Sequence, residues 1–407
     1  MLTSILTLII NINLRIAMVW ITAAEALTIL NVRPQTLYAN VSRGKIRAQP
    51  DSKDSRRSLY HREDVMRMAK RTNGRRTLEV VAAQAIEWGD PVLPSAISTV
   101  IDGRLWYRGQ DAVALSRTAS LEQVAALLWE YPQADFQQAL VAGGSPTRHF
   151  KGFSQASAAG LIALAERSGR DLPSTGRALP VLRAEAAGVL ATLTEAMLGI
   201  DITSSESTLS ESLAQAWQCP EAEKVLRQTL VLLAEHELNA SAFAVRVTIS
   251  TGASLAAGVL SGLASLTGPL HGGASRSLNV LVDSTRRVGA QQAVREWLAQ
   301  GRTLPGFGHP LYPDGDVRAN AIMAMLPSGG PYGELMEYVA QAAGERPSID
   351  FALALLADTY NLPQEAPFIL FAVSRCSGWL AHALEQVAAS RLIRPRARYV
   401  GIPPQAL

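Results

Sequence analysis

The stretch Gly268-Pro269-Leu270-His271-Gly272-Gly273-Ala274, followed by Pro305-Gly306-Phe307-Gly308-His309, is the most informative part of this 407-residue sequence. Glycines beside a histidine let the backbone turn sharply and approach a ligand closely. A neutral imidazole can donate a hydrogen bond or transfer a proton near pH 7. A single histidine is more often structural, but two histidines framed by glycines predict a reaction site.

Charged residues further along the chain indicate the substrate. Arg318, Arg375 and Arg394 are well spaced, and the paired donors of their guanidinium groups can hold carboxylates. Asp350 has no arginine beside it in the sequence, so its carboxylate is available as a base. Its alternative role is to cap the helix that we expect to begin at Phe351. Together these residues predict that the substrate is a small polycarboxylate.

Five motifs in a fixed order extend this pattern. They are His236-Glu237-Leu238-Asn239-Ala240-Ser241, Gly268 to Ala274, Gly306-Phe307-Gly308-His309 through Asp316-Val317-Arg318-Ala319, Ser348-Ile349-Asp350-Phe351 and Arg394-Pro395-Arg396. Their order and spacing resemble the citrate synthase family, over residues 78–407 or roughly four fifths of the chain. The resemblance implies an all-α fold, in which a large domain and a small domain, near residues 272–357, close over the substrates.

The resemblance also implies a role for each motif residue. Asp350 would abstract the methyl proton of acetyl-CoA, His271 would donate a hydrogen bond to the thioester carbonyl, and His309 would polarise the ketone of oxaloacetate. Condensation would give citryl-CoA, which is hydrolysed to citrate and CoA without a metal or a redox cofactor. The oxaloacetate site carries over to His236, His309, Arg318, Arg375 and Arg394. Arg394 would come from the other subunit, which implies a homodimer. The loops that hold CoA carry over to Leu270, Gly272, Gly273, Ala274, Leu304, Pro305, Gly306, Phe307 and Gly308.

Two departures from the family pattern leave the acyl substrate open. Asp316-Val317-Arg318-Ala319 stands for Asp-Pro-Arg-Ala, and Pro310-Leu311-Tyr312-Pro313 stands for a more basic segment. Residues 131–198 carry none of the expected motifs. An additional methylene changes binding by only about 1 kcal/mol. The alternative is therefore a 2-methylcitrate synthase that uses propionyl-CoA.

The charge is unevenly distributed along the chain. The net charge is +3, but residues 1–76 carry 14 Lys and Arg against 5 Asp and Glu, which leaves 24 against 30 for residues 77–407. A small basic module fused to a mildly acidic enzyme predicts a polyanionic partner, most simply nucleic acid. A solvated basic face is the alternative interpretation.

The order of elements near the amino terminus favours nucleic acid. Thr22-Ala23-Ala24-Glu25 predicts a capping box for a helix that ends near Asn31, and Pro34 opens a second helix over residues 35–42. A basic hairpin over residues 45–47 and 56–60 precedes a third helix. This order resembles the winged helix-turn-helix of the mercury-resistance regulator and excisionase group. Predicted DNA contacts are Arg33, Gln35, Thr36, Tyr38, Arg43, Arg56 and Arg57. A structural or protein-docking module is the alternative.

The remaining segments complete the predicted organisation. Residues 1–17 are a largely apolar tail, with no basic leading segment and too short to span a bilayer, so we expect no secretion signal. The helix-turn-helix module occupies residues 18–70, and a polar linker occupies residues 71–77. The rest is predominantly helical, except for a short hairpin expected between Ile97 and Tyr107.

The two cysteines, Cys219 and Cys376, form no disulfide framework, so we expect a reducing compartment, the cytoplasm.

Two hypotheses from different classes follow. The first is a citrate synthase that carries a DNA-binding or docking module. The second is a DNA-binding regulator whose synthase-like domain senses metabolites. Asp350 favours the first, because binding alone needs no base.

Overall fold

The computed structural model describes residues 20–30, 34–42, 45–51, 58–73, 93–143, 155–202, 207–272, 274–397 and 401. The chain divides into two compact units, Met1–Pro94 with Ala397–Leu407, and Ser95–Arg396. Several predictions fall outside the described residues: the tail 1–17, Arg33, Arg43, Arg56, Arg57, Gly273 and the side chain of Gln35. None of the helices described is long and apolar enough to cross a bilayer.

The first unit combines three helices with a small antiparallel sheet in the order β1-β3-β2. Its elements are β1 (Trp20–Ile21), α2 (Ala23–Leu30), α3 (Pro34–Ser42), β2 (Ala48–Pro50), β3 (Ser58–His61) and α4 (Arg62–Asn73). The predicted capping box is confirmed: the Glu25 N–H donates to Thr22 Oγ1 at 3.3 Å, and the Thr22 N–H donates to the Glu25 carboxylate at 2.8 Å. Ile21, Leu37 and Tyr60 belong to a core of their own.

Three details of this unit differ from the prediction. The strand expected at residues 45–47 begins only at Ala48, because Ile46 turns into the core and Arg47 donates to Asp64 through Nε at 2.7 Å. Strand β1 was not predicted, because a strand of two residues is too short to show the alternation of apolar and polar residues that marks a strand. Helix α4 continues to Asn73, three residues into the predicted linker.

The second unit begins with a sheet of three short strands, β4 (Ser98–Ile101), β5 (Arg104–Tyr107) and β6 (Gln110–Asp111). Strands β4 and β5 pair antiparallel through a turn at Asp102 and Gly103, both with positive φ. The predicted hairpin between Ile97 and Tyr107 is therefore confirmed. With a sheet in each unit, the chain is mostly helical, and the all-α prediction is corrected to that extent.

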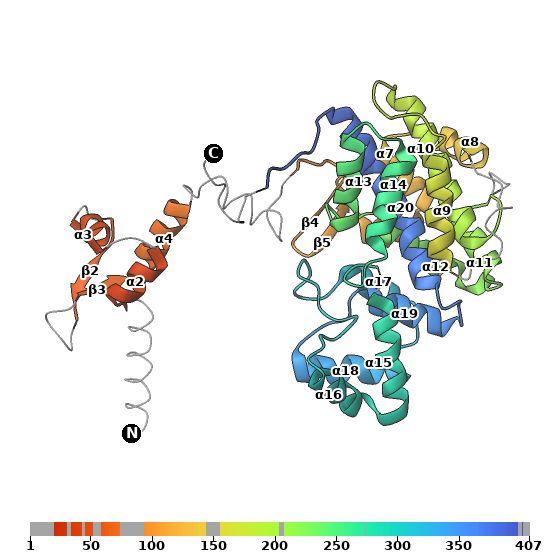
Figure 1. The fold of residues 1–407 in the computed structure, drawn as a ribbon. Helices are drawn as coiled ribbons and strands as arrows, with labels where there is room; N and C mark the ends of the chain where they lie inside the picture. Colours follow the sequence, from red (N-terminus) through yellow and green to blue (C-terminus); the bar gives the residue numbers. More distant parts are fainter. Residues whose placement is uncertain are drawn as a thin grey trace. The chain divides into compact units, whose positions relative to one another are not determined.

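Helices form the rest of the second unit, in two lobes (Figure 1). The larger lobe contains α6 (Ala112–Thr118), α7 (Leu121–Trp129), α8 (Gln133–Gly143), α9 (Ala156–Ser168), α10 (Leu179–Leu198), α11 (Leu209–Ala216), the 3₁₀ helix η2 (Pro220–Ala222), α12 (Glu223–Leu233), α13 (Ala240–Ser250), α14 (Leu255–Leu266) and α20 (Ala366–Ala389). The smaller lobe contains α15 (Ala274–Val288), α16 (Ala290–Ala299), α17 (Val317–Met323), α18 (Gly330–Ala343) and α19 (Ile349–Thr359). These five helices span the segment predicted as the small domain.

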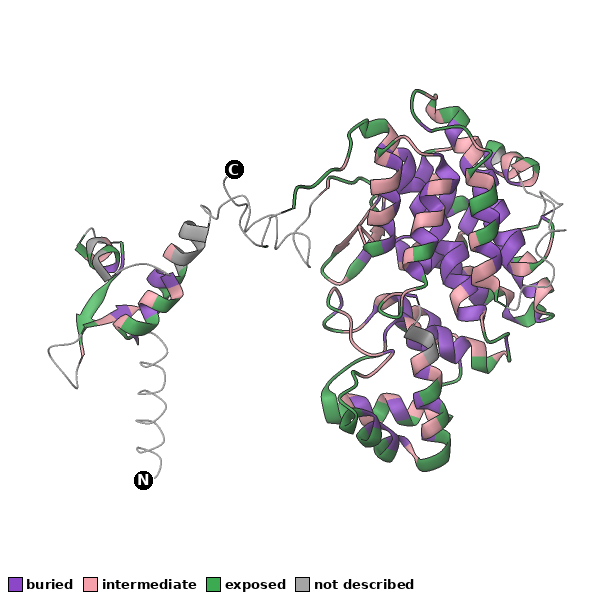
Figure 2. Ribbon diagram, in the orientation of Figure 1, coloured by how far each residue is buried: buried purple, intermediate pink, exposed green. Residues whose placement is uncertain are grey.

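Helix α20 lies at the centre of the larger lobe and is buried along most of its length (Figure 2). It contacts α7, α10, α12, α13 and α14. Its sequence is apolar on every side, which is the pattern of a helix surrounded by protein. The Trp129 indole N–H donates to the Ser377 carbonyl at 2.8 Å and ties α7 to it. The one arginine of this helix, Arg375, is therefore placed in the interior of the unit.

Candidate functional site

The residues predicted for the reaction come from the ends of helices in both lobes. His236 follows α12, His271 follows α14, and His309 lies between α16 and α17. The rings of His236 and His309 meet edge to face, with centroids 5.2 Å apart. Burial lowers the pKa of His236 well below its usual range, and the charges of Arg318 and Arg375 lower it further. The three histidines and two arginines thus act on one another within one site.

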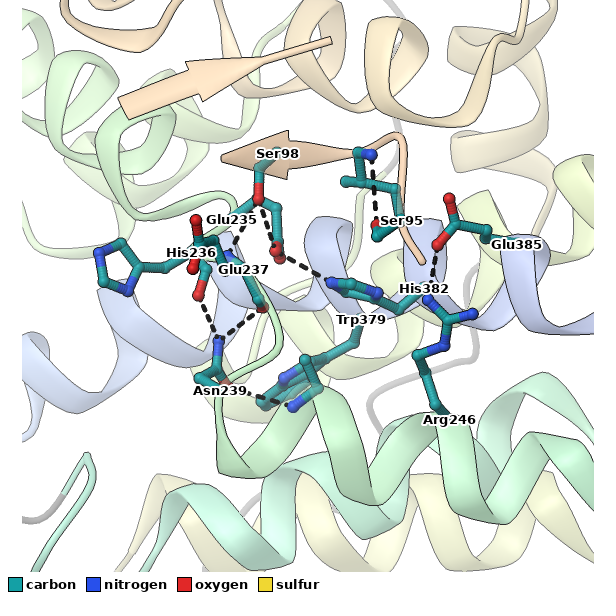
Figure 3. A network of polar contacts seen from close by, with 12 residues as sticks. Ser95, Ser98, Glu235, His236, Glu237, Asn239, Arg246, Trp379, His382 and Glu385 are labelled. Carbon is teal, nitrogen blue, oxygen red and sulfur yellow. Dashed lines mark hydrogen bonds and ion pairs between the residues drawn. The ribbon is translucent and has the colours of Figure 1, made fainter. Parts of the chain in front are cut away.

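The turn that carries His236 is held by the β4–β5 hairpin (Figure 3). Glu237, the next residue, has φ of 52°. Its N–H donates to Ser98 Oγ at 3.0 Å, and its carboxylate accepts from the Val100 N–H at 2.7 Å. These bonds stabilise a left-handed conformation that a non-glycine residue rarely adopts. The His236 ring is then free to pair through Nε2 with the Tyr312 hydroxyl at 2.9 Å.

The proton position on His309 follows from its neighbour. The Leu311 N–H donates to His309 Nδ1 at 3.2 Å, so this nitrogen carries the lone pair. Burial, with Arg318 adding to it, lowers the pKa of His309 to about 4. The ring is therefore neutral at physiological pH, and its proton is on Nε2. His309 can offer a neutral N–H to a ligand oxygen.

Gly306 and Gly308 join the His309 loop to the segment before Asp350. The Gly308 N–H donates to the Arg346 carbonyl at 2.8 Å, and the Ser348 N–H donates to the Gly306 carbonyl at 2.8 Å. Both glycines have positive φ. A side chain on Gly306 would also collide with Leu278. Glycine is favoured at both positions because other residues rarely adopt this positive φ.

Arg318 is committed to an ion pair that the sequence did not predict. Its Nε and Nη2 atoms donate to the two oxygens of Asp316 at 3.0 and 2.8 Å, with both residues buried. Burial alone would raise the pKa of Asp316, but the charge and hydrogen bonds of Arg318 hold it below its usual range. The same carboxylate accepts the Ile349 N–H at 3.1 Å. Asp316 therefore joins α17 to the first turn of α19, next to Asp350.

His271 is held on the other side of the site by Ser241. The Ser241 hydroxyl lies 2.9 Å from His271 Nε2, donates to Asn239 Oδ1 at 2.7 Å and accepts from the Trp379 indole at 3.0 Å. A hydroxyl can donate only one hydrogen bond. Because Ser241 donates to Asn239, His271 Nε2 carries the proton of the hydrogen bond between His271 and Ser241. Burial lowers the pKa of His271 to about 4, with Arg375 adding to the effect. The ring is neutral, and Nδ1 is its remaining nitrogen.

Asp350 lies in the first turn of α19 and retains some exposed surface. Burial raises its pKa to about 6, while Arg318 opposes the shift. No ion pair neutralises Asp350 among the residues that the structure describes. A carboxylate with these properties is suited to accept a proton near neutral pH.

Arg375 extends from α20 toward the end of α12. Its Nε donates to the Leu233 carbonyl at 2.9 Å, and its guanidinium lies 4.8 Å from the ring centre of Phe371. Within the described parts of the chain, its buried Nη2 has no hydrogen-bond partner. A buried guanidinium with an unused donor is prepared for an anionic ligand.

Arg394 does not join the other site residues. The tail after α20 is held by the Ile393 N–H, which donates to Ser250 Oγ at 3.1 Å, at the carboxyl end of α13. Ser241 and Asn239 lie at the amino end of that helix, roughly 15 Å away at 1.5 Å per residue. Arg394 is exposed, and its predicted role, in the site of the other subunit, stays a prediction.

The loop residues predicted for CoA have mixed surroundings. Leu270 is fully exposed, Gly272 is buried against Leu266, and Leu304, Pro305 and Phe307 are partly buried. Ala274 is the first residue of α15. Beside His309 a cavity of about 480 Å³ opens, lined in part by Glu345 and Arg346.

The residues that hold the reactive groups in place were not predicted from the sequence; they are Asn239, Ser241, Tyr312, Asp316 and Trp379. Asn239, Ser241, Tyr312 and Asp316 stand within the motif ranges quoted above, two to five residues from a predicted functional side chain, which is the signal that could have identified them. Trp379 has no such signal, because its contact with Ser241 joins distant parts of the chain.

Comparison with known proteins accounts for this arrangement. Residues 87–396 match the family model described as citrate synthase, C-terminal domain. The chain belongs to the citrate synthase family. Members of this family are enzymes of the transferase class, and the enzyme prediction is confirmed.

Relatives within the family carry two names. Citrate synthase 2 of Bacillus subtilis (strain 168) is 28% identical over 345 residues, which is 75% of this chain and 93% of the relative. A 2-methylcitrate synthase of Shewanella oneidensis is 34% identical over 194 residues, 45% of this chain and 52% of the relative. The structure of a ternary complex of carboxymethyl coenzyme A and oxaloacetate with citrate synthase from Thermoplasma acidophilum has the same fold. Its TM-score is 0.66 at 22% identity, over 78% of this chain and 96% of that one.

The raised pKa of Asp350 predicts a pH-dependent gain in stability for Asp350→Asn. Because the folded-state pKa, about 6, exceeds the usual 3.8, folding favours the protonated form, and this contribution is lost as pH rises through 6. Asparagine cannot ionise, so the variant should be more stable at pH 8 by up to about 3 kcal/mol, less for the exposed part of the side chain. Thermal unfolding at pH 8 and at pH 3.5 measures this.

The difference should vanish at pH 3.5, where both side chains are uncharged. Asp314→Asn, at an exposed loop position, is the matched control and should change the unfolding temperature little at either pH. An equal shift for Asp350→Asn at both pH values would contradict the assignment.

Proposed function

We propose that this enzyme is a citrate synthase, which condenses acetyl-CoA with oxaloacetate and hydrolyses citryl-CoA to citrate and CoA. The observation that carries the proposal is the Asp350 carboxylate, which has no ion pair among the described residues and whose charge interacts with buried Arg318, in a site that also holds Arg375 and three neutral histidines. Taking a proton from the methyl group of a thioester needs a base and an electrophile that act together. The proposed reaction requires neither a metal nor a redox cofactor.

Oxaloacetate would be held by Arg375, Arg318 and His236. Arg375 offers its unused Nη2, and Arg318 keeps Nη1 outside the pair with Asp316. The Nε2–H of His309 would donate to the ketone oxygen of oxaloacetate. This donor supports the ketone while it becomes an alkoxide, and because the ring is neutral it adds no charge in the ground state.

Acetyl-CoA would react between Asp350 and His271. The Asp350 carboxylate takes a methyl proton, and the electron pair of that C–H bond forms an enolate whose oxygen accepts a hydrogen bond from His271 Nδ1–H. For Nδ1 to carry the proton, the Ser241 hydroxyl turns from Asn239 to donate to Nε2, and the ring proton moves from Nε2 to Nδ1 by exchange with solvent water. The nucleophilic carbon then attacks the oxaloacetate ketone, whose oxygen takes up a proton, and water cleaves the thioester. The fully exposed Leu270 and the loop of Gly306 and Gly308 would contact CoA.

A homodimer is part of the proposal. The tail that carries Arg394 leads away from the site of its own chain. In a two-fold dimer the same tail can enter the partner's site and supply a third arginine for oxaloacetate. The alternative acyl substrate is propionyl-CoA, supported by the relative named 2-methylcitrate synthase. The two buried free cysteines support a reducing compartment, the cytoplasm.

DNA binding is a second candidate function, assigned to the first unit as a winged helix-turn-helix. It is supported by the basic excess of residues 1–76 and by α3, a helix without acidic side chains. Thr36 and Tyr38 are exposed on this helix, Tyr38 by 56%. With Arg33 and Gln35 they would face the duplex, while Arg43, Arg56 and Arg57 would contact phosphates. A regulator that senses metabolites without turnover is the competing hypothesis.

Thiol release with oxaloacetate and either acetyl-CoA or propionyl-CoA tests the main proposal and the acyl preference together. We expect turnover with acetyl-CoA, and a loss of at least about 1000-fold in kcat for Asp350→Asn, because the base is removed. Oxaloacetate binding, measured by calorimetry, should change little, since arginines hold the dicarboxylate. An active variant, or one that no longer binds oxaloacetate, would show that Asp350 has another role.

Mixing two inactive variants tests the shared site. Asp350→Asn and Arg394→Ala subunits should recover about a quarter of wild-type activity, because half of the randomly formed dimers contain one intact site of two. Subunit exchange is confirmed first by mass spectrometry of the mixed dimers. A mixture that exchanges but stays inactive would count against Arg394 acting in the partner's site.

Salt dependence tests DNA binding. Affinity of the full-length protein for duplex DNA should fall with a slope of about −3 or steeper in log K against log salt, if at least three phosphates are neutralised. The double variant Arg56→Gln, Arg57→Gln should reduce that slope by about 2. Deletion of residues 1–76 should remove binding and keep thiol release. Absence of affinity at low salt would leave the unit with a structural role.

A further inference from the structure

The proposed mechanism gives no role to the buried carboxylate of Glu235. It precedes His236 and is completely buried, as is His382, whose Nε2 lies 3.0 Å from Glu235 Oε1 (Figure 3). The same oxygen accepts from Ser98 Oγ at 3.1 Å. Two contacts from opposite sides therefore fix one oxygen of this carboxylate. Its other oxygen, Oε2, has no hydrogen-bond partner among the described residues.

Helix α20 brings Arg375 to the same carboxylate. Arg375, Gly378 and His382 are spaced by three and four residues, so they lie on one face of the helix. A side chain at Gly378 would collide with Glu235 Oε2. The missing side chain lets the carboxylate lie against α20, between the arginine on one side and the histidine on the other.

Electrostatics connect Glu235 with Arg375 in particular. Burial lowers the pKa of Arg375 to about 10, Glu235 opposes this shift more than any other group, and Arg318 adds to it. No direct ion pair joins these two described residues, so the attraction acts through space. The site thus holds two buried arginines that repel each other. Asp316 balances the charge of Arg318 through a direct ion pair, and Glu235 opposes the charge of Arg375 without a direct contact.

We propose that Glu235 is a positioning residue for the substrate dicarboxylate, which orients and supports the Arg375 guanidinium so that its unused Nη2 faces the ligand. His382 and Ser98 hold the carboxylate in place for this purpose. The Leu233 carbonyl fixes Nε of the same guanidinium from the end of α12. The inference rests on the proposed function, in which Arg375 binds oxaloacetate.

Two substitutions separate the charge of Glu235 from its packing. Glu235→Gln keeps the shape and an acceptor for His382 and Ser98 but removes the charge. We expect oxaloacetate affinity, measured by calorimetry on the full-length protein, to fall about tenfold or more, with KM for oxaloacetate rising and kcat little changed. His382→Gln keeps the charge and a donor for it. This control should lower the unfolding temperature but leave oxaloacetate affinity within about threefold.

Glu235→Asp serves as a second variant, because it keeps the charge but shortens the side chain by one methylene, which moves the carboxylate, and it should also weaken oxaloacetate binding. It decides the question if Glu235→Gln fails to fold, as judged by circular dichroism. Unchanged affinity in the folded Glu235 variant, or equal losses in the Glu235 and His382 variants, would assign Glu235 a structural role only. A wild-type protein that does not bind oxaloacetate would overturn the proposed function together with this inference.

Discussion

The buried ion pair of Asp316 and Arg318 is the interaction on which the rest of the site depends. Each side chain is almost inaccessible to solvent, and a buried charge without its partner would cost several kcal/mol. The pair also reaches α19 through the Ile349 N–H. The backbone bonds of Gly306 and Gly308 join the His309 loop to the same segment. One polar assembly therefore sets the positions of the base, the ketone donor and an arginine.

Burial, together with the charge of the two arginines, sets the protonation of the groups around them. Burial and the charge of the arginines keep His236, His271 and His309 neutral. Each ring can therefore donate a hydrogen bond without adding a positive charge to the site. Asp350 experiences the opposite balance, since burial outweighs Arg318 and its pKa rises. The same low-dielectric surroundings thus produce weakly basic histidines and a more basic carboxylate.

Local chemistry explains what the sequence could predict. The glycines that flank His271 and His309 lie within a few residues of each histidine, and the Asp102-Gly103 pair is a local signal for the hairpin that it forms. The contacts that support the site have no local signal of this kind. Tyr107 bonds to the end of α12 across more than 120 residues, as its hydroxyl donates to the Val231 carbonyl at 3.1 Å. Contacts between residues so far apart in the sequence arise from tertiary packing, which the periodicity of a helix or a strand does not predict.

The central position of α20 has a consequence for how the chain matures during synthesis. This helix is the last one in the described sequence, yet Trp129, Leu233 and Glu235 all find hydrogen-bond partners on it. While the ribosome still holds those final residues, the earlier helices surround an empty core position with exposed apolar surface and unpaired polar groups. The larger lobe therefore completes its core only when α20 enters it, and until that step the exposed apolar surface is prone to aggregation.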